Sequence, residues 1–283
     1  MVRSLWTAAT GMKAQQTNLD NISNNLANVN TLGYKTKKAE FKSLLYQTLQ
    51  TKSTNNAGDD KPVPAQVGLG TRVADISTSF TQGPLKASES PYNMAIEGEG
   101  FYKIRMADGT IGYTRDGDFT VSPEADGNML VTPDGYAVLD QNNNPIVIPN
   151  TYRSYTLSVD AEDGSLHLTD DEGKDVRLAA VNEAGETIYE VCIGLVQFNN
   201  PDGLDALGGN LFGVTPASGE PMEESTTQGL TRSKVHQFYL EGSNVQVVDE
   251  MVNMIVAQRA YEMNSKIITA SDEMMQQANN LRG

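Results

Sequence analysis

Residues 140–144, Asp-Gln-Asn-Asn-Asn, resemble the first half of a calcium-binding loop, because carboxylate and amide oxygens alternate there. Pro145, however, replaces the glycine that such a loop needs for its turn, and Thr151 stands where the bidentate glutamate belongs. The sequence therefore predicts no metal site at this loop.

The remaining candidates for chemistry are equally incomplete. Residues 98–100, Gly-Glu-Gly, lack the third glycine of a dinucleotide-binding loop, which would fall at Lys103. His167 and His236 are the only histidines, and neither has a cysteine or another histidine nearby. We expect no catalytic residue, no cofactor site and no metal ligand, and hence no enzyme.

Both ends of the chain carry rows of residues at seven-residue intervals, apolar except for Gln15, and these positions are called the seam below. The amino-terminal seam consists of Leu5, Ala8, Met12, Gln15, Leu19, Ile22, Leu26 and Val29. The carboxy-terminal seam consists of Val247, Met254, Tyr261, Ile268 and Met275. A repeat of seven keeps one face of a helix turned toward a partner, so the pattern predicts two long terminal helices that form a coiled coil.

Neither helix can bury its seam alone, and two arrangements are open. The helices can pair as a hairpin within one chain, or they can join an intermolecular bundle. The length of the seams and the long sequence gap between them favour the bundle. The chain's ends are therefore interpreted as its assembly parts, and the seam as a polymerisation surface.

Past Val29, Gly33 permits the left-handed turn that ends a helix. Phe41, Leu44, Leu45 and Leu49 predict a second, short amphipathic helix. The polar composition of residues 51–64 is typical of a linker. The expected organisation is therefore a helical assembly segment at 1–45, an extended linker at 46–70, a β-rich body at 71–235 and a second helical assembly segment at 236–283.

The middle of the chain has the pattern of short β-strands. Asp-Gly pairs, typical of tight hairpin turns, occur at 108–109, 116–117, 126–127, 134–135, 163–164 and 202–203. The segments 101–105, 119–121, 136–139 and 155–159 are rich in aromatic and branched residues. The predicted fold is mainly β, with an irregular sandwich or barrel-like central domain flanked by the terminal helices.

Composition narrows the possible partners. The formal charge is −15, but residues 1–52 hold seven basic and two acidic residues, so this segment is +5 and the rest is −20. An acidic body argues against nucleic acid. The basic residues of 35–42 are expected on a solvated or inter-subunit surface. No segment has the roughly 20 apolar residues of a membrane span.

The first residues are too short and too polar for a cleavable secretion signal. If the chain leaves the cytoplasm, we expect it to do so without one. Cys192 has no second cysteine to pair with and is interpreted as a buried, small apolar residue.

The terminal segments also carry a family resemblance. Residues 24–31 (Asn-Asn-Leu-Ala-Asn-Val-Asn-Thr) and 33–35 (Gly-Tyr-Lys) resemble the amino-terminal signature of bacterial flagellar rod and hook proteins. Residues 243–245, 250–255 and 258–264 resemble its carboxy-terminal counterpart, and residues 95–102 and 113–117 extend the similarity into the body. Residues 3–6, 10–16 and 41–47 are most similar to the distal-rod members, while the acidic interval 150–187 is unlike the family pattern.

The resemblance implies a structural axial protein that polymerises into a tube through its terminal helices and transmits torque to the hook. Implied partners are further copies of the chain, other rod and hook proteins, the flagellar type III export apparatus and ring proteins around the rod. In related export substrates an aromatic residue followed four residues later by an apolar one is recognised by the export gate. Phe41 and Leu45 fit this pattern, and an amphipathic contact in the polymer explains them equally well.

Hook and proximal-rod proteins of the same family remain alternatives. Two other classes are weaker candidates. A secreted β-rich hydrolase needs a convergent set of acid, base or metal-binding groups, which the sequence does not provide. A β-rich adhesin does not need paired seams at its ends.

Overall fold

The computed structural model describes residues 2–50, 65–124, 127–149, 157–169, 175–181, 187–227 and 229–281. The chain folds into two compact units. Unit 1 comprises residues 1–27, 37–78 and 246–283, and unit 2 comprises residues 28–36 and 79–245. The expected borders at 45, 70 and 235 differ from these, because the segments on either side of each expected border pack into the same unit.

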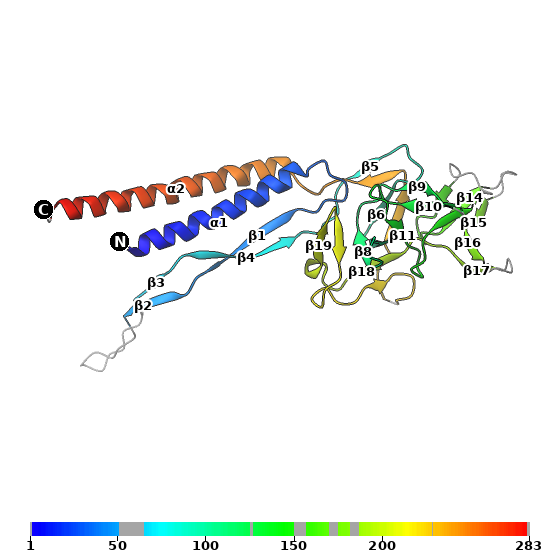
Figure 1. Ribbon diagram of the computed structural model, residues 1–283, viewed down its shortest axis with the longest axis horizontal. Helices are drawn as coiled ribbons and strands as arrows, with labels where there is room; N and C mark the ends of the chain where they lie inside the picture. Colours follow the sequence, from blue (N-terminus) through cyan, green and yellow to red (C-terminus); the bar gives the residue numbers. More distant parts are fainter. Residues whose placement is uncertain are drawn as a thin grey trace. The chain divides into compact units, whose positions relative to one another are not determined.

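Unit 1 contains two long helices, α1 (Val2–Ala27) and α2 (Val247–Asn280), which lie side by side and run in opposite directions (Figure 1). The hydroxyl oxygens of Ser4 and Ser271 are 3.4 Å apart. A Cβ atom added to Gly11 would lie 2.9 Å from Nδ2 of Asn264. Small residues therefore allow close approach of the helices. Terminal helices were predicted correctly, and they pair within one chain, which is the less favoured of the two expected arrangements.

A two-stranded ribbon completes unit 1 (Figure 1). β1 (Lys37–Ser43) pairs antiparallel with β4 (Thr71–Thr78), and β2 (Tyr46–Gln50) pairs antiparallel with β3 (Ala65–Gly68). The predicted short helix through Phe41 and Leu49 is therefore wrong. Its backbone groups bond to a partner strand, and this long-range pairing overrides the weak helical spacing of four apolar residues. The expected linker at 51–64 lies outside the described residues.

Unit 2 is built of many short strands. Its largest sheet has ten strands, with the order β12-β10-β11-β7-β8-β20-β19, while β9 pairs with β10, β18 pairs with β7, and β21 pairs with β18. These strands are β7 (Phe101–Arg105), β8 (Ile111–Thr114), β9 (Thr120–Pro123), β10 (Gly127–Val131), β11 (Ala137–Val138), β12 (Val147–Pro149), β18 (Leu195–Gln197), β19 (Asp205–Gly208), β20 (Leu211–Gly213) and β21 (Met222–Glu223).

Unit 2 also contains four smaller sheets among the described residues. They are formed by β13 (Leu157–Val159), β14 (Leu166–Thr169) and β15 (Asp175–Arg177); by β16 (Ala179–Val181) and β17 (Thr187–Glu190); by β6 (Met94–Glu97) and β22 (Lys234–Gln237); and by β5 (Leu85–Ala87) and β23 (Tyr239–Glu241). A short 3₁₀ helix, η2, spans Pro201–Gly203.

The mainly β class is confirmed, but the expected barrel-like closure is not found. In the described part of the chain, the sheets remain open. Most strands are two to five residues long, as the bounds above show, and neighbouring strands pair with different partners, so no continuous cylinder of hydrogen bonds forms. No helix in this part of the chain is long and apolar enough to cross a membrane.

Two apolar cores stabilise unit 2. The larger one lies beneath the big sheet and the three-stranded sheet and includes Met94, Tyr102, Phe119, Leu130 and Leu166. The smaller one is aromatic. It consists of Phe101, Tyr113, Val196, Phe198 and Phe212, and Phe101 meets Phe198 and Phe212, and Tyr113 meets Phe198, edge to face at ring-centroid distances of 5.0–6.1 Å.

Several expected turns are confirmed by backbone geometry. Gly109, Gly135 and Gly164, each from an Asp-Gly pair, have φ angles of 83°, 84° and 64°. Gly33, expected to end the first helical segment, has a φ of 64°, and a Cβ there would lie 2.8 Å from the amide nitrogen of Asp116. Glycine is therefore required at position 33 both by conformation and by space.

Candidate assembly surface and buried polar cluster

The seam residues lie mainly between α1 and α2 of the same chain. On α1, Ala8 and Ile22 are buried, while Leu5, Met12, Gln15, Leu19 and Leu26 are half-buried. On α2, Met254, Ile268 and Met275 are half-buried, whereas Val247 and Tyr261 are each 40% exposed. Val29 lies beyond the end of α1 and belongs to unit 2. The seam is therefore largely occupied by the hairpin.

The most deeply buried positions of α2 are small or polar. Glu250, Ala257 and Ser271 are buried, and with Met254, Asn264, Ile268 and Met275 they follow one another at separations of three, four or seven residues. Such spacing gathers side chains on one helix face. This face of α2 meets α1.

A second side of α2, away from the face that meets α1, exposes a row of apolar side chains to solvent. Its members, called the outer stripe, are Val248, Val252, Val256, Met263, Ile267 and Met274, with exposed fractions of 74%, 54%, 62%, 60%, 45% and 51%. Separations of four and seven residues place them on one side of the helix. Soluble monomers rarely expose such a row, which marks an interaction surface. The same spacing rule that identified the seam could have found this row in the sequence.

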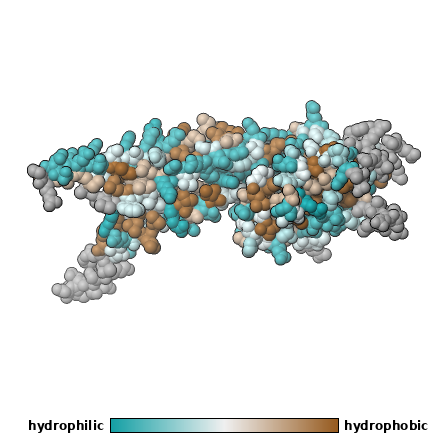
Figure 2. Space-filling view, in the orientation of Figure 1, coloured by the Kyte–Doolittle hydropathy of each residue, from teal (hydrophilic) through white to brown (hydrophobic). Residues whose placement is uncertain are grey.

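The ribbon also exposes apolar side chains. Phe41 is 38% exposed, Leu45 83%, Tyr46 60% and Leu49 54%. Apolar side chains reach the surface over both the ribbon and the helices (Figure 2). Phe41 and Leu45, proposed from the sequence as an export signal, therefore lie on an accessible part of the ribbon.

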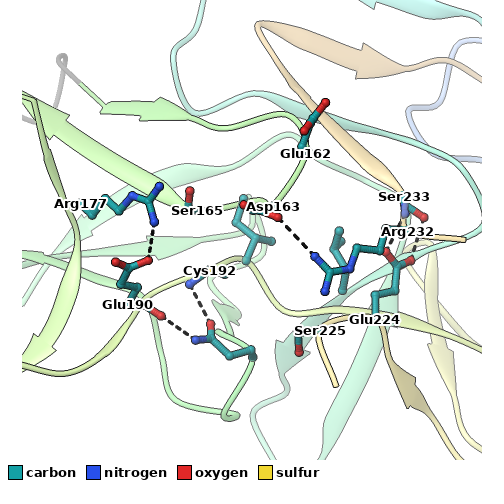
Figure 3. Close-up of a pocket in the computed structure, with 13 residues that line it drawn as sticks. Glu162, Asp163, Ser165, Arg177, Glu190, Cys192, Glu224, Ser225, Arg232 and Ser233 are labelled. Carbon is teal, nitrogen blue, oxygen red and sulfur yellow. Dashed lines mark hydrogen bonds and ion pairs between the residues drawn. The ribbon is translucent and has the colours of Figure 1, made fainter. Parts of the chain in front are cut away.

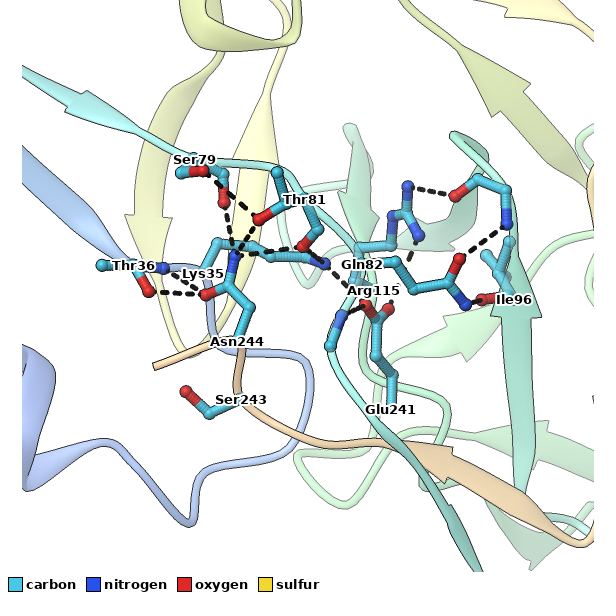
Figure 4. Close-up of polar contacts among 12 residues, drawn as sticks. Lys35, Thr36, Ser79, Thr81, Gln82, Ile96, Arg115, Glu241, Ser243 and Asn244 are labelled. Atoms are coloured by element: carbon cyan, nitrogen blue, oxygen red, sulfur yellow. Dashed lines mark hydrogen bonds and ion pairs between the residues drawn. The ribbon is translucent and has the colours of Figure 1, made fainter. Parts of the chain in front are cut away.

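Unit 2 holds a buried ionic group, called here the Glu241 cluster (Figure 4). Oε1 of Glu241 accepts hydrogen bonds from Nζ of Lys35 at 2.6 Å and from the amide of Gly83 at 2.8 Å. Nη1 of Arg115 lies 3.5 Å from Oε2 of Glu241, an ion pair too long for a hydrogen bond. The three charged side chains are 0–2% exposed.

The electrostatics of the Glu241 cluster reflect its burial. Burial lowers the pKa of Lys35, and the negative charge of Glu241 opposes this change. Burial also lowers the pKa of Arg115, whose guanidinium donates to the carbonyl of Gly98 and lies 5.0 Å from the centroid of the Phe101 ring. Loss of one partner would leave an uncompensated charge in the core, so the three groups depend on one another.

Lys35 was expected on a solvated basic surface, and that expectation is wrong. Its neighbours Lys38 and Lys42 are exposed, as expected, but Lys35 follows the turn at Gly33 and points into unit 2. The run of basic residues in the sequence gives no sign that Lys35 is buried and its neighbours are exposed. Lys35 differs from them only in its partner Glu241, which lies more than two hundred residues away in the sequence.

Asn244 connects three separate segments of unit 2 (Figure 4). Its Oδ1 accepts hydrogen bonds from the amide and the hydroxyl of Thr36, each at 2.7 Å. Its Nδ2 donates to the carbonyl oxygens of Ser79 and Thr81 at 2.9 and 3.0 Å. Residues 36, 79 and 245 are the last or first residues of unit 2 where the chain passes to unit 1. One amide therefore fastens the three segments at these crossings.

The calcium-like loop holds a lysine ammonium group. Nζ of Lys103 donates to the carbonyl of Gln141, to Oδ1 of Asn143 and to Oε1 of Glu223 at 2.8–3.0 Å. The Oδ1 atom of Asp140 accepts from the amides of residues 142 and 144. The loop oxygens thus bind an internal cation. No group of residues that could hold a metal ion occurs in the described part of the chain.

A pocket of unit 2 is lined by Cys192 and by several charged side chains (Figure 3). In it, Arg177 pairs with Glu190 and Arg232 pairs with Asp163. Cys192 lines the pocket and is half-buried, rather than fully buried as expected, and burial raises the pKa of its thiol. Each guanidinium of the pocket is thus already matched by a carboxylate.

One set of contacts is arranged like a catalytic triad, which the sequence did not suggest, and consists of Ser165, His167 and Asp175. Oγ of Ser165 lies 3.1 Å from Nε2 of His167, whose Nδ1 is 3.5 Å from Oδ2 of Asp175. A nucleophile must reach its substrate, however, and Ser165 is only 3% exposed. Asp175 is 63% exposed, so water competes for its contact with the histidine. These contacts support the strands rather than a reaction.

Three segments of the chain match families of flagellar proteins. Residues 5–35 match the family of flagella basal body rod proteins, residues 95–168 match the D1 domain of flagellar hook proteins FlgE/F/G, and residues 236–281 match the carboxy-terminal region of the flagellar basal body rod proteins FlgEFG. The first and last of these matches include most of α1 and α2.

Relatives match over almost the whole chain. The flagellar basal-body rod protein FlgG of Borreliella burgdorferi is 42% identical over 100% of this chain and 99% of its own length. FlgG of Agrobacterium fabrum is 42% identical over 96% and 97%, and FlgG of Bacillus subtilis is 38% identical over 100% of both chains. The flagellar hook-basal body complex protein FlhP of Bacillus subtilis is 32% identical. The chain thus belongs to the FlgG family of flagellar basal-body rod proteins and is a structural rod protein of the flagellar basal body.

Proposed function

We propose that the chain forms the rod by polymerising into a tube through unit 1, with the outer stripe of α2 as its principal contact between copies. The observation that carries this proposal is the exposure of six apolar side chains along a side of α2 that does not meet α1. Burying that face removes apolar area from water, at about 25 cal/mol per Å². A contact between different faces of identical chains that does not close on itself produces a helical array.

The seam takes a different part in this proposal from the one expected. It holds α1 and α2 together within a chain, and the residues left exposed along it, such as Tyr261, add to contacts between copies. The hairpin then presents the outer stripe as one rigid surface. The other rod and hook proteins, and ring proteins around the rod, are the partners proposed for the ends and the outside of this polymer.

The Glu241 cluster and Asn244 support a mechanical role for unit 2. Torque that acts on unit 1 reaches unit 2 through the covalent crossings of the chain. Asn244 fastens three of these segments to one another. The ion pair of Lys35 with Glu241 joins two of the same segments, because Lys35 precedes Thr36 and Glu241 lies shortly before Asn244. Buried hydrogen bonds such as those of Asn244, and of Lys35 to Oε1 of Glu241, hold these segments in fixed positions. We therefore assign torque transmission to this network.

Export is the step for which Phe41 and Leu45 are proposed, with the flagellar type III apparatus as partner and no cleavable signal peptide. Replacement of both by alanine, Phe41→Ala with Leu45→Ala, should abolish secretion and leave unit 2 folded, because neither residue belongs to it. The matched control is Leu49→Ala with Leu69→Ala, which removes exposed leucines from the same ribbon. Normal secretion of the first variant, measured in the culture medium, would exclude this role.

Assembly is tested by electron microscopy of the purified full chain at rising concentration. Straight tubes are expected for the natural sequence. Val256→Asp with Met263→Asp should remove them, because two charges would be buried between copies. Gln258→Asp with Gln276→Asp adds the same charge at exposed polar positions of α2 and should still assemble. Tubes formed by the first variant, at the natural concentration threshold, would contradict the proposal.

A further inference from the structure

Unit 1 contains a groove that neither the hairpin nor the ribbon fills. It has a volume of about 350 Å³ and lies between α1 and the ribbon. Its lining residues are Thr10, Lys13, Ala14, Thr17, Leu44, Thr71, Arg72 and Val73. The four helical residues recur at intervals of three and four, so one face of α1 forms one wall. The groove is therefore a built feature of unit 1 alone.

Backbone details hold the two walls together. The hydroxyl of Thr10 accepts a hydrogen bond from the amide of Thr71 at 3.4 Å. Gly70 adopts a φ of 115°, and a Cβ there would fall 2.1 Å from Oγ1 of Thr10. Only glycine allows the ribbon to approach α1 this closely. The geometry of the groove is thus fixed by contacts at its end.

The chemistry of the groove is apolar at the base and cationic at the rim. Ala14, Leu44 and Val73 supply the apolar part, and Ala14 is buried. Lys13 and Arg72 are exposed, and neither forms an ion pair with another described residue. The groove therefore suits an apolar side chain that has a carboxylate beside it.

A third cation strengthens this charge. Lys42 faces Arg72 directly across the β1–β4 pair. Residues opposite each other in an antiparallel pair project from the same face, and like charges in such positions destabilise it. Lys42 is exposed as well. Repulsion between Lys42 and Arg72 therefore destabilises the ribbon in the isolated chain, and a bound carboxylate would offset this repulsion.

The outer surface of α2 has the complementary chemistry. Met274 of the outer stripe is 51% exposed, and the exposed Glu273 precedes it. Between Ile267 and Leu281, α2 contains two acidic residues and no basic one. Within a single chain the outer stripe lies on the face of α2 that is turned away from α1. We propose that the groove takes the distal part of α2 from a second copy, with Met274 against its apolar base and Glu273 between Arg72 and Lys13.

This inference rests on the proposed self-assembly and assigns it a specific pair of surfaces. Because the groove and the stripe are different surfaces, each copy can give one and receive the other. Such a heterologous contact propagates without closing. The ribbon then contributes to the rod through its basic residues as well as its apolar ones.

A charge exchange tests the contact. Arg72→Glu and, separately, Glu273→Arg should each raise the concentration at which tubes appear by about tenfold or more, because each places like charges together at the contact. The combination of both should bring the threshold back to within about threefold of the natural one. Lys38→Glu, an exposed change on the same ribbon outside the groove, is the matched control and should leave the threshold unchanged.

The outcomes separate the two proposals. Unchanged assembly of Arg72→Glu, or a combined variant that assembles worse than either single one, would overturn the groove contact. If Val256→Asp with Met263→Asp still fails to assemble in that case, the outer stripe stands and only its docking site is wrong. Circular dichroism of each variant confirms that the helices of unit 1 have formed. Failure of the natural chain to form tubes would instead count against the assembly proposal itself.

Discussion

Unit 1 and unit 2 bury very different side chains. Among the described residues, the buried apolar side chains of unit 1 are Ala8, Ala14, Ile22 and Ala257, whereas unit 2 buries two apolar cores that include large aromatic rings. The large apolar side chains of unit 1 are largely exposed instead. Unit 2 thus buries its cores within one chain, whereas unit 1 leaves most of its large apolar side chains exposed in the single chain, as expected if other copies cover them.

This difference has a physical basis. A helical hairpin buries one face of each helix, and an isolated two-stranded ribbon is marginally stable in water. Neither can build a core of the size found in unit 2. Exposed apolar area in unit 1 is therefore both the limit on its own stability and the source of free energy for assembly.

The largest expected effect on stability lies in the Glu241 cluster. Lys35→Met removes the closest partner of a fully buried carboxylate and should lower the free energy of unfolding of unit 2 by about 3–5 kcal/mol. Lys38→Met, at an exposed position, is the control. Urea unfolding monitored by tyrosine fluorescence measures both. A loss below about 1 kcal/mol would mean that the cluster does not hold unit 2 together.

A smaller effect is expected between the helices of unit 1. Gly11→Leu introduces a side chain where Asn264 already lies and should cost about 1–3 kcal/mol, with unit 2 unaffected. Ala9→Leu, on the exposed side of α1, should be neutral. Helical circular dichroism during heating reports unit 1 selectively, because the long helices belong to it. Equal melting of the two variants would show that the helices do not pack closely at Gly11.

Asp116 provides a test of unit 2 by pH. Burial raises its pKa from 3.8 to about 6. A carboxyl whose pKa is raised in the folded state binds protons more strongly there, so unit 2 should lose stability as the pH rises from about 4 to about 6 and then level off. Partial exposure limits the loss to about 1–2 kcal/mol. Asp116→Asn should remove this slope, and a slope that survives would assign it to other groups.

The smallest expected change in stability is at the outer stripe. Met263→Gln should alter the unfolding free energy of the monomer by less than about 0.5 kcal/mol, because the side chain is 60% exposed. The same variant should assemble at higher concentration than the natural chain. Marked destabilisation of the monomer would show that Met263 supports the hairpin itself, and would weaken the contrast between the two units.

The sequence predicted local features better than long-range ones. Both terminal helices, the turn at Gly33 and the strand at 101–105 follow from periodicity and turn chemistry within short windows. The ribbon did not, because β1 forms only by pairing with β4, about thirty residues away. The open sheet escaped prediction for the same reason, since strand order depends on distant partners.

Candidate sites show the same division. The spacing of Val252, Val256 and Met263 by four and seven residues is enough to predict the outer stripe, but the more regular rows of the seam predicted a different surface. Lys35 and Asn244 carry no local signal, because Lys35 looks like its exposed neighbours and Asn244 like any loop amide. Their roles arise from residues far along the chain. Buried polar networks of this kind require the fold before they can be recognised.

We expect the outer stripe to be solvent-exposed in the monomer and covered by another copy in the rod. A nitroxide spin label at Met263→Cys, with Cys192→Ser to leave a single thiol, tests it by electron paramagnetic resonance before and after assembly. A mobile label is expected in the monomer and an immobilised one in the tube. A label that stays mobile in fully formed tubes would contradict it.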